Sequence, residues 1–434
     1  MSDNTSRNGV DRKSAAAPAV MEIEGAVQHY DWGGYEFIPR LLGIENTIRE
    51  PYAELWIGAH PGAPSIARFD GEVIPLNRLI ETSPDAYLGD STAARFEDRL
   101  PYLFKVLDAF KMLSIQAHPS KAQAEEGFAR ENAAGIPLTA SNRNYKDDNH
   151  KPEVHVALTD FWMLHGFRPL DEIAGLGATT PELAPVLGDF GKRLERAGTG
   201  AARKDLLRSV YGGIMALPQG EIDRVLNPLL ARLAGERPSD KDSADYWALR
   251  AADNFPLPDG HRDRGIVSIY LLNLVHLKPG QGTYQPAGML HAYLEGINVE
   301  LMANSDNVLR GGLTPKHVDV AELMQTLTFE SGPSAVILGD AVAKVKTVYR
   351  TPAAEFELSQ IALDGGTGFD AGSMHGPDAV IVLEGAVTVE SAGQSLDLKR
   401  GGIFFARAGF PYRVKASQPA VLFKASVPAN LQVP

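Results

Sequence analysis

The sequence predicts a mainly β protein with two β-sandwich or β-barrel domains and one inserted α-helical domain. The first observation is a series of short apolar runs that are repeatedly broken by glycine and proline, which favours sheets over alternating βαβ units. The second is a helical spacing of apolar residues that is confined to residues 169–261. The third is an even spacing of strand-like runs over the last hundred residues, which predicts a second small barrel.

These observations divide the chain of 434 residues, whose length suggests about three domains. Residues 1–20 are small and polar and are expected to form a disordered tail. Residues 21–165 and 263–333 are expected to form the catalytic domain, and residues 166–262 the helical insertion. Residues 334–434 are expected to form the C-terminal barrel.

The expected elements follow in chain order. Strands are predicted at 22–28, 54–60, 102–107 and 112–118, and a helix is predicted to start at Ser120 because Ala and Glu follow that residue. A strand at 151–158 follows a polar loop, and helices are predicted at 201–211 and 222–233. Strands resume at 266–277 and 289–296, and further strands are predicted at 379–390, 402–406, 412–415 and 420–424.

Composition excludes several classes of protein and site. The chain has no cysteine, so disulfides, thiolate nucleophiles and cysteine zinc sites are all excluded. Its net charge of -12 argues against nucleic-acid binding, and no apolar run approaches the ~20 residues of a membrane span. The first twenty residues lack the apolar core of a secretory signal, and we therefore expect a cytoplasmic protein with no membrane partner.

The chain is organised around residues 113–125, which read as a strand, a proline turn and a helix start. A side-chain period of two places Ser114, Gln116 and His118 on one face of this strand. Three polar groups on one face need partners when they are buried, so they are expected to form one wall of a polar pocket. The strand at 151–158 has the same pattern, with Lys151 and Glu153 on a polar face.

A Pro-x-Gly-x-x-His motif ends at His291 and resembles the second cupin motif, in which a glycine turn aims the histidine into a barrel. The first cupin motif corresponds to Gln116-x-His118, with its carboxylate supplied by Glu153. The amide oxygen of glutamine can coordinate a borderline cation. The predicted domains are therefore two cupin-like β-barrel (jelly-roll) domains, of which only the first holds a metal.

Several longer motifs together resemble one family, type I mannose-6-phosphate isomerase, also called phosphomannose isomerase. They are QHYDWGG, PYAELWIGAHP, LPYLFKVLDAFKMLSIQAHPSKAQAE, NHKPE, PAGMLHAYLEG and ELMANSDNVLRGGLTPKHVDV. The resemblance covers nearly all of residues 21–330, and the motifs occur in the order of the family.

The resemblance implies a metal-dependent aldose–ketose isomerase that interconverts D-mannose 6-phosphate and D-fructose 6-phosphate through an enediol(ate). It implies one zinc ion per chain, a phosphorylated hexose as substrate, a monomer, and a role in mannose breakdown or in the supply of activated mannose such as GDP-mannose. The implied zinc ligands are Gln116, His118, Glu153 and His291. The implied catalytic residues are Arg310, Lys151 and Glu300, and the implied substrate-binding residues are Lys105, Ser114 and Lys316.

The residue chemistry fits this reaction, because a divalent cation stabilises an enediolate and basic side chains can hold a phosphate. Either Lys151 with a lowered pKa or an ionised Glu300 could move the proton, and the sequence leaves both open. Two alternatives remain, a metal-dependent cupin oxygenase and a non-catalytic sugar-binding cupin. An oxygenase would normally need more histidine ligands.

Overall fold

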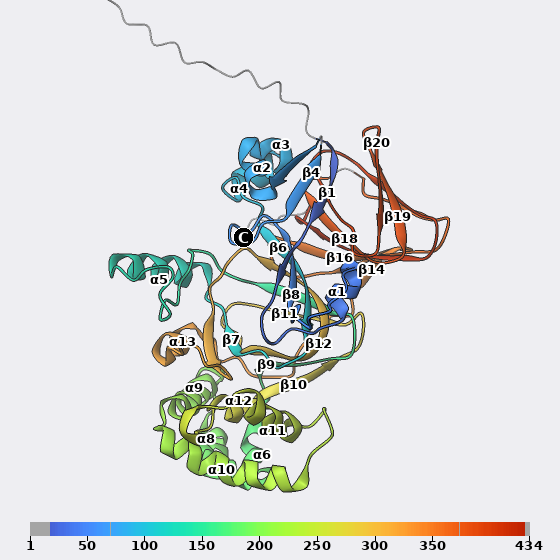
Figure 1. Cartoon of the computed structure of the whole chain (residues 1–434). Coiled ribbons are helices and arrows are strands. Elements are labelled where there is room, and N and C mark those ends of the chain that lie inside the picture. The colour runs from blue at the N-terminus through green and yellow to red at the C-terminus, as the bar shows by residue number, and fades with distance from the viewer. Residues whose placement is uncertain (1–17, 70, 373, 430–434) are drawn as a thin grey trace, which may run out of the picture.

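The computed structural model describes residues 18–429 except 70 and 373, so most of the tail expected at 1–20 lies outside the described residues. The protein is mainly β with substantial helices, as predicted. Two large sheets lie together in the upper part of Figure 1, and a block of helices lies below them. No helix among the described residues is both long enough and apolar enough to cross a membrane.

The first large sheet has ten strands and carries the polar pocket. Its main order is β10-β9-β12-β6-β3-β2, and β8, β11, β7 and β13 extend it through pairings with β12 and with one another. Its strands are β2 (Ala26–Gln28), β3 (Glu54–Gly58), β6 (Tyr102–Ala109), β7 (Ile115–Ala117), β8 (Glu153–Ala157), β9 (Phe161–Phe167), β10 (Leu272–Leu277), β11 (Gly282–Gln285), β12 (His291–Ala303) and β13 (Leu309–Gly312).

The second large sheet has nine strands, in the order β14-β15-β16-β23-β18-β21-β1-β4-β5. They are β1 (Val20–Glu24), β4 (Ile66–Phe69), β5 (Glu72–Pro75), β14 (Asp340–Ala343), β15 (Lys346–Tyr349), β16 (Glu357–Leu363), β18 (Asp378–Glu384), β21 (Ile403–Ala406) and β23 (Ala420–Ser426). A four-stranded sheet covers its outer face: β17 (Gly368–Asp370), β22 (Arg413–Ala416), β19 (Ala386–Ser391) and β20 (Gln394–Lys399).

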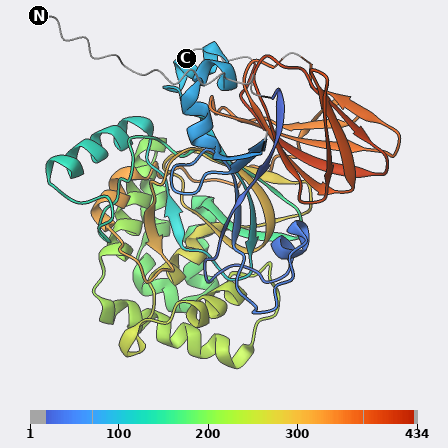
Figure 2. The same ribbon diagram turned by 45° about the horizontal axis from the view of Figure 1, so that its top comes forward.

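The nine-stranded sheet crosses the expected domain boundary. Strand β1 pairs with β21 near the C-terminus, with Met21 opposite Phe405, and also pairs with β4. Strands β1, β4 and β5 therefore belong to the same sheet as the C-terminal strands (Figure 2). Local sequence pattern identifies a strand but not its partner, because pairing is decided by non-local packing.

The strands of the ten-stranded sheet alternate between an apolar and a polar face. Phe104, Val106 and Val299 pack into one core together with Phe405 and Phe423 of the nine-stranded sheet. Because successive side chains of a strand point to opposite faces, the residues between them point the other way. Lys105, Glu300 and Glu153 are such residues, and this alternation creates the polar pocket.

Helices α6 to α12 form the block below the sheets, packed around one core (Figure 1). They are α6 (Leu170–Thr179), α7 (Ala184–Leu187), α8 (Phe190–Arg196), α9 (Gly200–Ala216), α10 (Gln219–Glu236), α11 (Ala244–Asn254) and α12 (Gly265–Leu271), with two short 3-10 helices at Pro181–Leu183 and Pro258–Gly260. The helices predicted at 201–211 and 222–233 are confirmed as parts of α9 and α10.

The remaining helices flank the sheets: α1 (Phe37–Leu42), α2 (Leu76–Thr82), α3 (Pro84–Leu88), α4 (Asp90–Arg95), α5 (Lys121–Ala133) and α13 (Val320–Thr326). The predicted helix start at Ser120 is confirmed, because Ser120 and Gln123 form a capping box at the N-terminus of α5.

One predicted element has the wrong conformation over part of its length, and the strand predicted at 379–390 is divided into β18 and β19. The run 266–277 was expected to be a single strand, but Gly265–Leu271 is helix α12 and only Leu272–Leu277 is strand β10. Every residue of α12 is buried, so its sequence is apolar on all sides. Such a run has no periodicity that distinguishes a buried helix from a buried strand, and the surrounding helices decide its conformation.

Candidate metal centre and substrate pocket

Three buried side chains converge at the ends of three strands. His118 follows β7, Glu153 begins β8 and His291 begins β12, and all three are at most 1% exposed. One potential ligand atom from each lies within 4.8 Å of the others, and this is the one such group of His, Asp and Glu found among the described residues. His118 Nε2 lies 3.4 Å and His291 Nε2 lies 3.2 Å from oxygens of Glu153.

The geometry of these atoms fits a metal ion. Neither Nε2 atom nor Glu153 Oε2 makes a well-formed hydrogen bond, although all three are buried. An unpaired buried polar group is costly, and a cation held by the three atoms would satisfy all of them. His155 is not part of this group, because its two ring nitrogens contact Thr283 and Asn298.

Backbone carbonyls orient both imidazoles. His118 Nδ1 lies 2.7 Å from the carbonyl of Asn307, and His291 Nδ1 lies 3.1 Å from the carbonyl of Met289. Donation from Nδ1 leaves the lone pair of Nε2 directed at the centre of the group. Burial lowers the pKa of His118 to about 4, even though Glu153 opposes this, so the ring is neutral at pH 7 as a metal ligand must be.

The turn before His291 depends on a glycine. Gly288 has φ +76°, and a Cβ there would lie 2.6 Å from Thr328 Cγ2 and 2.8 Å from the carbonyl oxygen of Thr326. Its N–H donates to the carbonyl of His118, which ties this turn to the other ligand segment. Only glycine combines a positive φ with such a close approach.

A cavity of about 350 Å³ lies beside these ligands. Eight of the ten residues that the sequence indicated for the site line this cavity: Lys105, Ser114, Gln116, Lys151, Glu153, Glu300, Arg310 and Lys316. His118 and His291 do not line the cavity but contact Glu153, which does. Gln116 lies opposite both His291 and Arg310 in the sheet, so it joins the ligand group to the cavity.

The ammonium of Lys105 is enclosed by two carboxylates. Lys105 Nζ lies 3.1 Å from Glu300 Oε1 and 3.7 Å from Glu54 Oε2, and all three side chains are less than 10% exposed. Burial by itself lowers the pKa of Lys105, but Glu54 and Glu300 outweigh it and raise this pKa above its usual value. Tyr293 donates a hydrogen bond of 2.6 Å to the other oxygen of Glu300, and burial raises the pKa of Glu300.

Two more of the cationic site residues, Lys151 and Arg310, differ in their partners. Lys151 Nζ lies 3.2 Å from Glu153 Oε1, so it borders the metal-binding group directly. Arg310 has no carboxylate within ion-pair distance among the described residues, and the carboxylate of Asp306, four residues earlier in the chain, contacts His60. Burial lowers the pKa of Arg310, which is an unpaired cation in the cavity wall.

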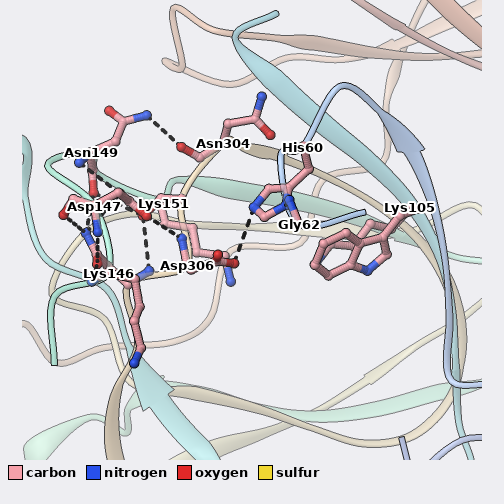
Figure 3. A network of polar contacts seen from close by, with 12 residues as sticks. His60, Gly62, Lys105, Lys146, Asp147, Asn149, Lys151, Asn304 and Asp306 are labelled. Atoms are coloured by element: carbon pink, nitrogen blue, oxygen red, sulfur yellow. Dashed lines mark hydrogen bonds and ion pairs between the residues drawn. The ribbon is translucent and has the colours of Figure 1, made fainter. Parts of the chain in front are cut away.

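A polar network joins the loop before β8, which includes Lys151, to the loop that leads into β13 (Figure 3). Asp147 accepts hydrogen bonds from the Ser305 hydroxyl at 2.8 Å and from the Asp306 amide at 2.7 Å. The side-chain oxygen of Asn307 accepts hydrogen bonds from the backbone amides of Lys146 and Asp147. The network therefore also fixes the Asn307 carbonyl that orients His118.

Comparison with known proteins identifies the family. A family model described as phosphomannose isomerase type I, catalytic domain, matches residues 20–170. The mannose-6-phosphate isomerase of Escherichia coli K12 is 36% identical over 401 residues, which cover 91% of this chain and 97% of that protein. The chain belongs to the mannose-6-phosphate isomerase family.

Relatives from other organisms and solved structures agree. The mannose-6-phosphate isomerase of Bos taurus is 32% identical and covers 93% of this chain and 97% of that protein. A crystal structure of a phosphomannose isomerase mutant from Salmonella typhimurium superimposes with a TM-score of 0.84 at 33% identity, covering 94% of this chain and all of that one. A zinc-bound mannose 6-phosphate isomerase superimposes with a TM-score of 0.82 at 34% identity.

Several residues of the cavity were missed by sequence reasoning. Glu54 lies in the predicted strand β3. Its side chain points to the cavity because of the way in which β3 pairs with β6, and the sequence does not reveal this pairing. Asn254 and Phe255 come from the end of α11, in the helical block that showed few polar clusters in the sequence. No local signal could have placed them there, because only the packing of α11 against the sheet brings them to the cavity.

Proposed function

We propose that this chain catalyses the interconversion of D-mannose 6-phosphate and D-fructose 6-phosphate. The single observation that carries the proposal is the buried His118–Glu153–His291 group beside a cavity with several cationic side chains. A metal site and a cationic cavity together suit a phosphorylated sugar whose reaction develops negative charge on oxygen. Membership of the isomerase family supports the same reaction.

The proposed cofactor is one zinc ion per chain, held by His118, Glu153, His291 and the side-chain oxygen of Gln116. Two imidazoles and a carboxylate form a donor set that suits zinc, and an amide oxygen is an acceptable fourth ligand. A bound zinc ion would supply Lewis-acid stabilisation of the enediolate oxygens.

The proton transfer requires one base that removes a proton from C2 of the open-chain aldose and returns it to C1. We assign this role to Glu300 in preference to Lys151. Burial raises the pKa of Glu300 above its usual value, which makes this carboxylate a stronger base, whereas the Lys151 ammonium contacts the Glu153 carboxylate. Lys151 and Arg310 are proposed to stabilise the negative oxygens that form.

Lys105, Ser114 and Lys316 are proposed to bind substrate, with Lys316 contacting the phosphate. All three border the cavity. Lys105 is already paired with two carboxylates, so its contribution to substrate binding is expected to be smaller than that of Lys316. The ammonium of Lys316 has no carboxylate within ion-pair distance among the described residues, which leaves it available to an anionic ligand.

We further propose two cupin-like domains, 21–165 with 263–333 and 334–434, which share the nine-stranded sheet through β1, β4 and β5, and a helical insertion at 166–262. The apolar core between the two large sheets supports a double-sheet architecture. We propose that the protein acts as a monomer, since the candidate metal ligands and the cationic side chains of the cavity come together within one chain. A cytoplasmic location is proposed because charged sugar phosphates do not cross membranes.

The test is a coupled assay of purified protein with mannose 6-phosphate, together with elemental analysis of the same sample. We expect production of fructose 6-phosphate, about one zinc per chain, and loss of activity on chelation that added zinc restores. Absence of isomerisation by zinc-loaded protein would contradict the proposal. Oxygen consumption with a candidate substrate would favour a cupin oxygenase, and sugar binding without turnover would favour a non-catalytic protein.

A further inference from the structure

A carboxylate from the helical block contacts the loop that follows β13 and carries Lys316. Asp263 lies just before α12 and is 5% exposed. Its Oδ1 accepts hydrogen bonds from the amides of Gly265 at 2.7 Å and Leu313 at 2.9 Å. Its Oδ2 accepts a hydrogen bond from the amide of Thr314 at 3.1 Å.

No cation balances this buried charge. Among the described residues, Asp263 has no ion-pair partner, so the three amides are its main electrostatic compensation. Two of the three donors belong to the loop after β13. The loop and α12 are therefore joined by hydrogen bonds to a charged acceptor, which are stronger than ordinary backbone hydrogen bonds.

Two glycines allow the carboxylate to reach the loop. A Cβ on Gly265 would lie 2.6 Å from the amide nitrogen of Leu313, and a Cβ on Gly312 would lie 2.6 Å from Gly265 Cα. Gly312 also has φ +122°, a conformation that side chains disfavour. The backbones therefore meet without side chains between them.

The loop has a conformation that it would not adopt unaided. Leu313 has φ +53°, which is uncommon for a residue other than glycine and persists only where surrounding contacts require it. Leu313, Thr314, Pro315 and Lys316 all line the cavity. The Lys316 amide donates a hydrogen bond of 3.1 Å to the Thr314 hydroxyl, so the position of Lys316 follows from that of Thr314.

We propose that Asp263 is a positioning residue for phosphate binding, which acts by holding residues 313–316 so that Lys316 faces the substrate phosphate. The inference rests on the proposed function and extends it. It also gives the helical block a role in the active site, because the block supplies the acceptor that shapes a substrate-binding loop. Asp263 does not line the cavity, and its effect passes through the loop.

The substitution Asp263→Asn is nearly isosteric but removes one acceptor and the charge. An amide side chain offers one oxygen, so a donor NH2 group must face at least one of the three backbone N–H groups. A buried amide is then left without an acceptor, and the loop is expected to relax. The matched control is Asp223→Asn, because Asp223 also accepts a backbone amide, that of Arg262, but makes no hydrogen bond to the loop.

The test measures KM, kcat, zinc content and the inhibition constant of inorganic phosphate for zinc-loaded full-length protein. For Asp263→Asn we expect a roughly tenfold rise in KM for mannose 6-phosphate, a change in kcat of less than about threefold, and unchanged zinc content. The inhibition constant of inorganic phosphate should rise by a similar factor. Asp223→Asn should leave KM and the inhibition constant within about twofold of the wild type.

A double-mutant cycle tests whether Asp263 acts through Lys316. In a Lys316→Ala background, Asp263→Asn should change KM by less than about twofold, because the group that it positions is already absent. Equal effects of Asp263→Asn in both backgrounds, or equal effects of Asp263→Asn and Asp223→Asn, would overturn the inference.

A further test measures hydrogen exchange of backbone amides in the wild-type protein. It requires neither activity nor a correctly folded variant. The amides of Leu313 and Thr314 should exchange at least about a hundredfold more slowly than in an unstructured peptide. Fast exchange at both amides would refute the hydrogen bonds to Asp263 even if the isomerase assay succeeds. If the wild type does not isomerise the substrate, the proposed function fails, while exchange and phosphate binding still report on the loop.

Discussion

The substitution Lys105→Met tests whether the buried ammonium holds the polar side of the pocket together. Methionine retains most of the length of lysine but lacks its charge, so the change leaves Glu54 and Glu300 without their shared cation. Each carboxylate keeps one other donor, Trp56 Nε1 for Glu54 and the Tyr293 hydroxyl for Glu300. The change therefore removes charge compensation and does not remove every hydrogen bond.

The magnitude follows from the burial of the three groups. Removing one partner of a buried ion pair lowers the free energy of unfolding by about 3–5 kcal/mol. Because Glu54 and Glu300 each keep one hydrogen-bond donor, we expect a loss near the lower value, about 3 kcal/mol at pH 8. Burial raises the pKa of Glu300, and loss of Lys105 removes the largest influence that opposes this rise. In the folded variant, Glu300 therefore binds a proton more readily than in the unfolded chain. As the pH falls towards 5, Glu300 becomes protonated and no longer needs a cation, so the loss of stability caused by Lys105→Met should become smaller.

The assay is urea denaturation of zinc-loaded protein at pH 8 and pH 5. The control is Lys415→Met, which breaks a pair with Glu390 in which both side chains are more than 40% exposed. Exposed pairs contribute at most about 1 kcal/mol, so the control should change the free energy of unfolding by less than this. A loss below about 1 kcal/mol for Lys105→Met at pH 8, or a loss that grows at pH 5, would refute the reasoning.

Three further outcomes are expected. His291→Ala should weaken zinc binding by more than about 100-fold and abolish activity, as measured by metal titration and the coupled assay. His375→Ala should alter neither, because His375 lies outside the His118–Glu153–His291 group. Arg310→Ala should lower kcat by roughly 100-fold with unchanged zinc content if the guanidinium stabilises the transition state, while a rise in KM alone would indicate phosphate binding. Burial raises the pKa of Asp108 to about 6, so stability contributed by its protonated form is lost as the pH rises through 6. Asp108→Asn should therefore stabilise the protein by up to about 2 kcal/mol at pH 8 and by little at pH 4, and equal effects at both pH values in denaturation experiments would contradict this.

Prediction from sequence succeeded where a local pattern determines the structure. The capping box at Ser120 and the helical periodicity of α9 and α10 are set within a few residues, and all three are present. The strand expected at 112–118 is shorter in the structure, Ile115–Ala117, because pairing with β12 and β13 covers only those residues.

Prediction failed where the structure depends on distant segments. The run 266–271 is helical because it is buried among other helices, and β1 joins the C-terminal strands because its apolar side chains complete their core. Glu54 and Asp263 each have ordinary sequence surroundings, and their importance comes from partners more than 45 residues away.

The sequence by itself determined the family and the mainly β class, and it indicated the three residues, His118, Glu153 and His291, that the structure brings together. These depend on residue types and on spacings within single strands and turns, which the chain carries locally. Only the tertiary structure decided that Lys105 is paired with two carboxylates, that Arg310 has no carboxylate partner among the described residues, and that Asp263 contacts the loop of Lys316. The physical reason is that the strength of an electrostatic contact depends on distance and burial, and both are set by how sheets and helices pack.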